Sequence, residues 1–352
     1  GRGVDRSGQS TAILFEPGNV VEMTFGAVDP SVSGMAVPGL GGAASGDMAR
    51  SFTQLGLAMK MQLNDRLSAA LIFDQPFGAD TDYPAGTGYY AAGSTAELTS
   101  ASITALLKYT TDRNLSLFGG LRWQRLGAAA FIPFITPVPG VTPPYQADGG
   151  ADAGLGYVLG VAWERPDIAA RVALTWNSPI RHDLETTESS FLGVSTSTTP
   201  VDAPQSLNLE LQTGIAPGTL LSASARWVDW SDFAITPQDY LALTGESIVS
   251  YRSDTVSYTL GLGRRFSDRW SGAVTLGYEA PVGGPASNLG PTDGYAWAGL
   301  GATYTAGAAR ISAGLRLVDV GDTRTRLGAT VPAANFNGNR AVAFGMKLAF
   351  AF

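Results

Sequence analysis

The chain ends on a segment whose side chains alternate between two kinds, and this pattern limits what the chain can fold into. From residue 342 onward, the even-numbered positions carry the large apolar side chains Val342, Phe344, Met346, Leu348, Phe350 and Phe352. The odd-numbered positions carry small or charged side chains, among them Gly345 and Lys347. A period of two indicates a β-strand with a different environment on each face. A terminal strand also needs a neighbour on both edges, which a closed barrel provides. Alternation over about ten residues is typical of membrane-spanning barrel strands.

The overall composition agrees with a barrel and excludes several other classes of protein. The 352 residues include 44 glycines and only 15% charged residues. No run reaches the roughly 18 consecutive apolar residues of a membrane helix, so we exclude a helical inner-membrane protein. The absence of cysteine removes disulfides, thiol catalysis and thiolate metal sites. A formal net charge of -7 argues against nucleic acid as a partner, because phosphates require a basic surface.

Residues 1–18 show no sustained alternation and precede the first strand. They contain one compact apolar group followed by a polar turn, with Ile13, Leu14, Phe15, Glu16 and Pro17 in sequence. We expect this segment to fold into the barrel lumen as a hatch, because each large apolar side chain gains roughly 1.5–3 kcal/mol by burial. The alternative is a frayed terminal tail. The first residues have neither the basic nor the apolar region of an export signal, so we expect the signal peptide to have been removed already.

The connections between alternating segments are of two lengths. Six are short polar turns, at residues 64–66, 111–114, 165–167, 217–218, 267–269 and 306–308. Seven are longer linkers, near residues 35–48, 77–93, 127–150, 181–204, 232–250, 281–292 and 321–338. Outer-membrane barrels have short periplasmic turns and long extracellular loops. The sequence therefore predicts an all-β fold in which residues 1–18 are a hatch and residues 19–352 a 14-stranded antiparallel transmembrane β-barrel, with seven long extracellular loops and six short periplasmic turns.

The alternation assigns one set of side chains to lipid and another to the lumen. The lipid-facing set includes Leu55, Leu57, Met59, Ile103, Leu107, Leu155, Tyr157, Leu159, Val172, Leu174, Val274, Leu276 and Tyr278. The lumenal set includes Lys60, Lys108, Arg122, Gln124, Glu164, Arg171, Asn208, Glu210, Arg226, Glu279, Arg316 and Lys347. A lipid-facing Lys or Arg near the middle of the bilayer costs roughly 2–4 kcal/mol, so we expect the charges to face inward. Aromatic side chains such as Trp123, Trp163 and Trp270 are expected at the membrane interfaces.

Several motifs resemble those of the FadL family of outer-membrane transporters for hydrophobic compounds. Residues 10–18 resemble the family's junction between hatch and first strand, with Glu16 where Asn is common. Residues 75–78 (Gln-Pro-Phe-Gly) are similar to its Pro-Phe-Gly stretch in the third strand. Residues 229–231 (Asp-Trp-Ser) look like its Asp-Trp-Ser motif, and residues 266–270 like its turn before a tryptophan. These motifs are spread over nearly the whole chain, and their order is more specific than any one of them.

This resemblance implies passive uptake of hydrophobic small molecules, such as long-chain fatty acids or aromatic hydrocarbons, across the outer membrane of a Gram-negative bacterium. Members of the family capture ligand at an extracellular loop groove, pass it to a lumenal pocket and release it sideways beside the kinked third strand. The hatch of this chain is shorter than is typical of the fatty-acid members. The expected partners are a hydrophobic ligand and outer-membrane lipid. We expect no enzymatic activity and no cofactor, and a single chain that closes its own barrel as a monomer.

Residues 126–146 are unusually apolar for an extracellular loop. They include Phe131, Ile132, Phe134, Ile135, Val138 and Tyr145, interspersed with five prolines. An exposed apolar patch usually marks an interaction site, so these residues are candidates for the ligand-binding groove. The alternative is that the loop folds down and caps its own barrel. Arg122 and Arg226 are candidate partners for the carboxylate of a fatty acid, or else members of a structural network.

Pro76 lies near the outer end of the predicted third strand and is followed by Phe77 and Gly78. A proline cannot donate a hydrogen bond to a strand ladder and is confined to edges and bulges. These three residues are therefore predicted to open a lateral gap between neighbouring strands. The alternative is that the strand simply ends there.

His182 is the only histidine and falls in the segment predicted as the long loop 181–204, near Ser189 and Ser190. A hydrolase of this kind would use histidine as a base beside a nucleophile, but the sequence has no Gly-x-Ser-x-Gly elbow. We therefore expect a surface histidine and no catalysis. The aspartates of the outer loops lack the spacing of an EF-hand, so no metal site is predicted. The inward charges alone also permit a general hydrophilic porin, and this alternative function stays open.

Overall fold

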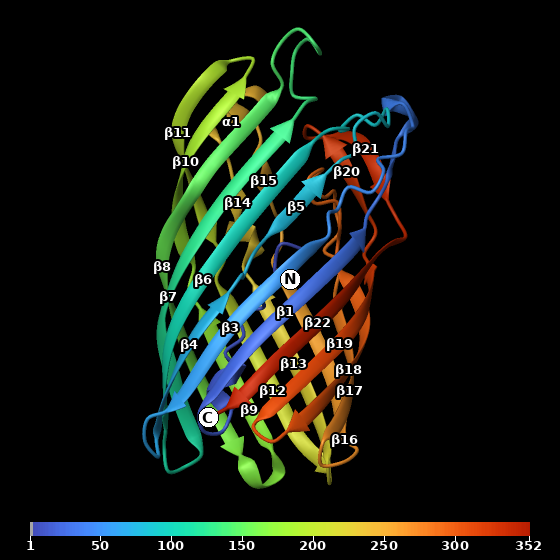
Figure 1. Ribbon diagram of the computed structural model, residues 1–352. Coiled ribbons are helices and arrows are strands. Elements are labelled where there is room, and N and C mark those ends of the chain that lie inside the picture. The colour runs from blue at the N-terminus through green and yellow to red at the C-terminus, as the bar shows by residue number, and fades with distance from the viewer. Residues whose placement is uncertain (1–2) are drawn as a thin grey trace.

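The computed structural model describes residues 3–352, which form a closed antiparallel β-barrel of 14 strands with loops at its upper end (Figure 1). The predicted fold class is thus confirmed. The barrel closes through its terminal strand, because β22 (Asn339–Ala351) pairs with both β1 (Val20–Ser31) and β19 (Ala309–Val320). The C-terminal strand therefore has the two neighbours that its alternation requires.

Three of the 14 wall strands are each built from two collinear segments. These are β4 (Leu67–Asp74) with β5 (Ala79–Asp82), β9 (Ala170–Asn177) with β10 (Ile180–Ser190), and β11 (Gly193–Ala203) with β12 (Ser206–Ala216). The continuous strands are β1, β3 (Phe52–Gln62), β6 (Thr95–Thr110), β7 (Leu115–Ile132), β8 (Tyr145–Arg165), β13 (Thr219–Val228), β16 (Thr255–Arg265), β17 (Trp270–Glu279), β18 (Tyr295–Ala306), β19 and β22. Each interruption contains a proline, namely Pro76, Pro179 or Pro204, because proline cannot donate to the ladder.

The turns at the lower end of the barrel lie where the sequence predicts them. They span residues 63–66, 111–114, 166–169, 217–218, 266–269 and 307–308, and the third contains η3 (Pro166–Ile168). The lipid-facing set is also where the alternation predicts it: Leu57, Leu159 and Leu276 are each at least half exposed. Lys60 and Arg122, on the opposite face of their strands, are buried. No helix among residues 3–352 is long and apolar enough to cross a membrane.

The upper connections differ from the prediction in three places. The loop predicted at residues 77–93 covers residues 83–94, because β5 continues the wall. β7 and β8 extend beyond the expected ends, so the loop between them covers residues 133–144 rather than 127–150. β10 and β11 join through Phe191 and Leu192 alone, so residues 181–204 form a hairpin that projects above the barrel (Figure 1). The prediction of seven long loops is therefore wrong at this connection. The hairpin stands in water, where its outer face is polar and gives no apolar alternation to reveal a strand.

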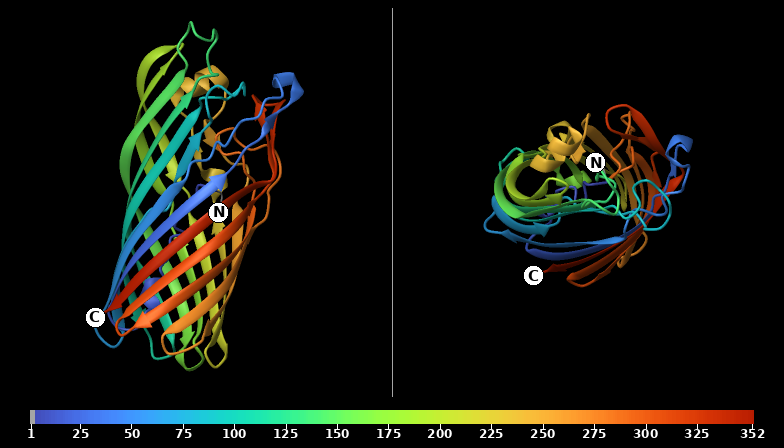
Figure 2. Two further views of the ribbon diagram at one scale, coloured as in Figure 1. Left: turned by 45° about the vertical axis from the view of Figure 1, so that its right-hand side comes forward. Right: turned by 90° about the horizontal axis from the view of Figure 1, so that it is seen from above.

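The barrel wall is much taller on one side than on the other (Figures 1 and 2). β7, β8, β10 and β11 rise well above the level at which β16, β17, β18, β19 and β22 end. The loop at residues 229–254 contains η4 (Trp230–Asp232), β14 (Ala234–Ile235), α1 (Gln238–Thr244) and β15 (Val249–Ser250). The loop at 321–338 contains β20 (Thr323–Leu327) and β21 (Val331–Phe336), and β21 pairs with β2 (Met35–Ala36), which is followed by η2 (Pro38–Leu40). The loop at 229–254 packs against β11 on the tall side, and the loops at 280–294 and 321–338 also lie at the upper end of the barrel (Figure 1).

Candidate ligand-binding site

The N-terminal segment lies inside the barrel and packs against one side of its wall (Figure 1). Within it, η1 (Ala12–Phe15) places Ile13 and Leu14, 5% and 0% exposed, against apolar side chains of β4, β6, β7, β8 and β9. The ring of Phe15 meets that of Phe118 edge to face, with centroids 5.8 Å apart. Pro17, also predicted as part of the hatch, is exposed. The segment has no strand pattern, and burial of its apolar side chains contributes to holding it in the lumen.

Charged groups of the lumen wall hold both ends of this segment. Arg226 on β13 donates to the two carboxylate oxygens of Asp5 at 2.8 and 2.9 Å. Arg310 on β19 pairs with Glu16 at 3.0 Å, and the ammonium of Lys60 donates to two backbone oxygens at the end of the hatch. Burial opposes ionisation of Asp5, but the charge and hydrogen bonds of Arg226 outweigh it and hold the pKa of Asp5 below its usual value. The hatch is therefore anchored by ion pairs as well as by packing.

Two further cations contact the ring of Phe15. The ammonium of Lys108 lies 4.6 Å from the ring centroid, and the guanidinium carbon of Arg171 lies 4.5 Å from it. Cations are attracted to the electron-rich face of an aromatic ring, by roughly 0.5–2 kcal/mol each. Lumenal charges that the sequence assigns to the inner face thus also hold the hatch.

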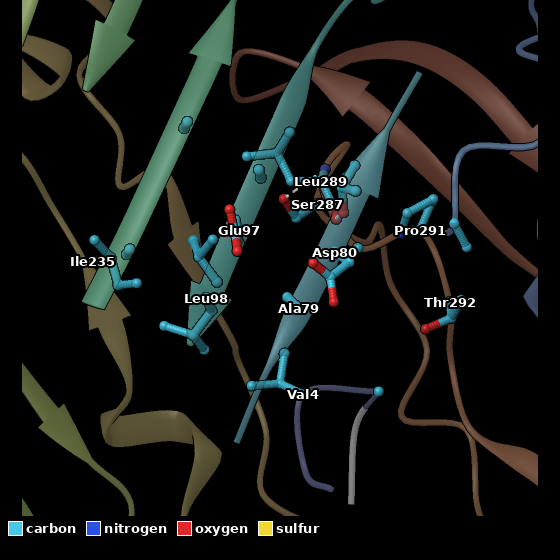
Figure 3. Close-up of a pocket in the computed structure, with 18 of the residues that line it drawn as sticks. Val4, Ala79, Asp80, Glu97, Leu98, Ile235, Ser287, Leu289, Pro291 and Thr292 are labelled. Carbon is cyan, nitrogen blue, oxygen red and sulfur yellow. Dashed lines mark hydrogen bonds between the residues drawn. The ribbon is translucent and has the colours of Figure 1, made fainter. Parts of the chain in front are cut away.

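A cavity of about 320 Å³ lies above the hatch, inside the upper part of the barrel (Figure 3). Val4 lines it from below, Ala79 and Leu98 line it from β5 and β6, and Leu289 and Thr292 line it from the loop at 280–294. Its lining is mostly apolar, with few charged groups. Its volume falls at the lower end of the range of small-molecule pockets, roughly 300–1,000 Å³. A cavity of this kind is able to hold a small hydrophobic molecule.

A second cavity of about 370 Å³ lies between the extracellular loops, and we call it the loop groove. It is lined by Ile132, Phe134 and Ile135, together with residues of the loops at 229–254, 280–294 and 321–338. Three of the residues predicted as a ligand-binding groove therefore meet here. Six other residues line both cavities and lie between them, namely Ile248, Tyr251, Ser287, Leu289, Gly290 and Thr292.

The other predicted residues of the apolar loop lie elsewhere. Val138 is 46% exposed at the tip of the loop, and Phe131, on β7, contributes to neither of the two cavities among the described residues. Tyr145 is fully buried, and its ring lies 5.0 Å from that of Tyr240 on α1. Burial raises the pKa of Tyr240 to about 12, so this phenol is neutral at ordinary pH. Tyr145 therefore supports the loops and does not line the groove.

The two arginines predicted to bind a carboxylate are engaged with protein groups. Arg122 donates to Thr104 Oγ1 at 3.0 Å and to Asn177 Oδ1 at 2.8 Å. Arg226 donates to Asn208 Oδ1 at 2.8 Å in addition to the carboxylate of Asp5 described above. Within residues 3–352, neither arginine lines either cavity. Their contacts tie wall strands to one another and to the hatch, and a ligand-binding role for them stays a prediction.

His182 lies on β10 and is 0% exposed, so the predicted surface position is wrong. Its Nδ1 is 2.9 Å from the backbone oxygen of Asp152, and its Nε2 is 3.1 Å from Gln124 Nε2. The error follows from the hairpin, whose inner face is packed against the lumen and not open to water. The ring of His182 is hydrogen bonded to an amide and a carbonyl group and lies 4.0 Å from the carboxylate of Asp152, and no serine hydroxyl of the described residues is hydrogen bonded to it.

The wall is interrupted beside the three residues predicted as a lateral opening, namely Pro76, Phe77 and Gly78. Below this point β3 pairs with β4. Above it, Ala49 and Thr81 form an isolated antiparallel bridge in the same register as the β3–β4 pairs. Residues 51–56 and 74–79 form no ladder pair with each other between these points. The pairing with β6 shifts by one residue between β4 and β5, which marks a β-bulge. We call this unpaired stretch the seam.

Glu188 on β10 organises the loops and is not among the residues predicted from the sequence. Its side chain is fully buried and accepts hydrogen bonds from Tyr145 Oη and from the backbone N–H groups of Asp239 and Tyr240. The only signal in the sequence is its spacing from His182, which places both side chains on the same face of a strand. That signal becomes useful only if residues 181–204 are recognised as a hairpin.

Comparisons with known proteins place this geometry in a family. The model of the outer membrane protein transport protein family (OMPP1/FadL/TodX) matches residues 19–323. The structure is similar to a Pseudomonas aeruginosa FadL homologue, with a TM-score of 0.77 and 16% identity over 97% of this chain and 92% of that one. It is also similar to the Pseudomonas putida toluene transporter TodX, with a TM-score of 0.66 and 12% identity over 99% of this chain and 96% of that one.

A third similar structure is the Ralstonia pickettii toluene transporter TbuX, with a TM-score of 0.64 and 12% identity over 96% of this chain and 90% of that one. No curated protein matches the sequence. At these identities the solved structures show a common fold, while the family model covers most of the chain. Together they confirm the predicted family resemblance and the outer-membrane location. The chain therefore belongs to the OMPP1/FadL/TodX family of outer membrane transport proteins.

Proposed function

We propose that this protein takes up small hydrophobic molecules across the outer membrane, with aromatic hydrocarbons and fatty acids as candidate substrates. The observation that carries the proposal is the mostly apolar cavity enclosed between the hatch and the extracellular loops. A hydrophobic molecule gains about 25 cal/mol for each Å² of apolar surface that leaves water for such a site. The similarity in fold to toluene transporters makes a monoaromatic hydrocarbon a suitable first probe.

Capture at the loop groove is the first step of this proposal. Phe134 and Ile135 provide apolar surface at the outer end of the protein, in reach of molecules that arrive from outside. The groove and the inner cavity share lining residues, among them Ile248 and Leu289, so the two cavities adjoin. Movement of these loop residues would pass a small molecule inward, without displacement of barrel strands.

Lateral release at the seam is the last step of this proposal. The hatch packs against the wall from β4 to β9 and lies below the cavity, so it stands in the direct path to the periplasm on that side. The seam borders the same cavity, since Phe52 and Ala79 belong to both. Below the seam, β3 presents Leu57 and Met59 to lipid, so a hydrophobic molecule that leaves here enters an apolar environment.

The test measures uptake by bacterial cells that lack their own transporters of this family and express the protein. Radiolabelled toluene and laurate are supplied separately, and the sugar arabinose serves as the hydrophilic control. We expect faster entry of at least one hydrophobic probe and no change for arabinose. Equal acceleration of arabinose, together with large steady single-channel currents in planar bilayers, would show a general porin instead and overturn the proposal.

A further inference from the structure

The side chain of Arg6 spans the seam from the lumen side. Its guanidinium carbon lies 3.6 Å from the centroid of the Phe52 ring on β3. Its Nη2 lies 3.3 Å from Oδ2 of Asp80 on β5. One side chain of the N-terminal segment thus contacts both strands that fail to pair with each other. In place of ladder hydrogen bonds, this stacked and ion-paired arginine joins the upper part of the seam. Lower down, Gln75 accepts hydrogen bonds from the backbone N–H of Leu55 and from Nε2 of Gln54.

The absence of a side chain on Gly78 makes room for this arginine. In the register shared by both ends of the seam, Gly78 stands opposite Phe52. A Cβ atom on Gly78 would lie 2.5 Å from Nη1 of Arg6, which is closer than atoms in contact can approach. Any larger residue at position 78 would therefore displace the guanidinium from its position between the two strands.

The backbone around Arg6 also replaces part of the missing ladder. The N–H of Gly78 donates to the backbone oxygen of Val4 at 3.0 Å, and the N–H of Arg6 donates to that of Pro76 at 2.9 Å. Asp5 forms an antiparallel bridge with Phe77. The side chain of Asp5 points the other way, to Arg226 on β13, so the segment is tied to the wall on both sides.

We propose that Arg6 is the latch that closes the seam, and that its release from Phe52 and Asp80 joins the inner cavity to the lipid outside. Arg6 itself lines the cavity, so its withdrawal opens the seam where the arginine passes between Phe52 and Asp80, above the contacts of Gln75. The proposal rests on the lateral release described above and assigns its control to a residue of the hatch. It also gives the segment before η1 a role separate from filling the lumen.

The test reads the state of the seam directly and does not depend on transport. The chain has no cysteine, so the variant Leu98→Cys gives a single attachment site, and its side chain faces the cavity (Figure 3). The thiol is labelled with monobromobimane and the protein is placed in phosphatidylcholine vesicles. A fraction of the lipid carries a nitroxide near the glycerol end of one acyl chain, which quenches the label only at short range. Folding of each variant is checked by its heat-modifiable mobility in gels.

In the labelled parent protein we expect weak quenching by lipid. Arg6→Ala removes the ring contact and the ion pair, which favours the open state by roughly five- to tenfold and increases quenching accordingly. Gly78→Ala keeps the arginine, but the added methyl group occupies the position of the guanidinium, so the same increase in quenching is expected. The matched control is Arg181→Ala, which breaks an exposed ion pair with Asp202 of the same 3.3 Å length on the projecting hairpin, far from the seam, and leaves quenching unchanged.

A double variant tests whether Arg6 and Asp80 act together. Asp80→Asn should raise quenching. The double variant Arg6→Ala with Asp80→Asn should give no more quenching than Arg6→Ala alone, which is less than the sum expected for independent sites. Unchanged quenching in folded Arg6→Ala and Gly78→Ala would overturn the latch, whatever is found for transport. Raised quenching with unchanged toluene uptake would support the latch and count against lateral release, so the two proposals fail separately.

Discussion

The carboxylate of Glu188 accepts a hydrogen bond from Tyr145 Oη at 2.7 Å and joins the projecting hairpin to the first residue of β8. The same carboxylate accepts hydrogen bonds from the backbone N–H groups of Asp239 and Tyr240, at 3.0 and 2.9 Å. Both of these groups lie in the first turn of α1. One buried side chain therefore holds three extracellular segments together above the cavities.

Glu188→Ala should loosen α1 without unfolding the barrel. Three donors lose a buried charged acceptor, and a hydrogen bond of this kind contributes roughly 1.5–3 kcal/mol. We expect amide hydrogen exchange of residues 238–244 to accelerate by at least about tenfold, since each 1.4 kcal/mol corresponds to a factor of ten. Glu185→Ala, on the exposed face of the same strand, is the control and should change nothing. Unchanged protection of α1 in Glu188→Ala would contradict this role.

Phe134→Asp should weaken capture of hydrophobic molecules. The substitution places a charge in the apolar part of the loop groove, where it must keep its water, so the apolar surface offered to a ligand decreases. We expect a higher half-saturation concentration for toluene uptake, with a smaller effect on the maximal rate. Val138→Asp introduces the same charge at the exposed tip of the same loop and should behave as the parent protein. An equal effect of the two substitutions would remove the groove from the route.

Leu14→Ala should destabilise the packing of the hatch. The Leu14 side chain is fully buried against the lumen wall, and truncation of a buried leucine to alanine typically costs about 2–5 kcal/mol. The measurement is protection of residues 3–18 from protease added on the periplasmic side, relative to the intact barrel. Pro17→Ala, at an exposed position of the same segment, is the control. Full protection of the hatch in Leu14→Ala would show that the ion pairs alone hold it.

The ion pair between Asp5 and Arg226 should make the hatch sensitive to acid. The pKa of Asp5 is lower in the folded protein than the usual value of about 3.9. Its contribution to stability is therefore present in full above that pH and is lost as the pH falls through the lowered pKa. In planar bilayers we expect quiet traces from neutral pH to about pH 4 and more frequent current fluctuations below it.

Asp5→Asn removes the charge at every pH and should give the fluctuations already at neutral pH. The control is Asp167→Asn, which breaks an exposed pair with Arg165 at a lower turn. Fluctuations that set in at the same pH in the parent protein and in Asp5→Asn would assign the acid response to another group.

Sequence patterns were sufficient to predict the strands that lie in the membrane. The alternation of residues 342–352 predicts β22 and its outward face, since lipid on one side imposes a strict period of two. The same rule fails for residues 181–204, where the strands stand above the membrane. There both faces carry polar side chains, and the pattern does not distinguish a strand from a loop.

The sequence predicted the apolar loop residues of the candidate site but not the residues placed by long-range contacts. The apolar character of Ile132, Phe134 and Ile135 is unusual for a loop, and these three residues line the groove. The positions of Arg6 and Glu188 depend on contacts with residues far away in the sequence, such as Asp80 and Asp239. Without the fold, nothing about an isolated arginine near the N-terminus indicates that it lies between two strands of the wall.

The pairing of β1 with β22 has a consequence for how the protein is assembled. These neighbours come from opposite ends of the chain, so the cylinder stays an open sheet until the final strand has been synthesised and inserted. The segment that precedes β1 is made before every strand of the wall, yet it is enclosed by the wall only at that last step. A chain that lacks β22 would lose one strand of the wall and also the closed lumen that holds its N-terminal segment.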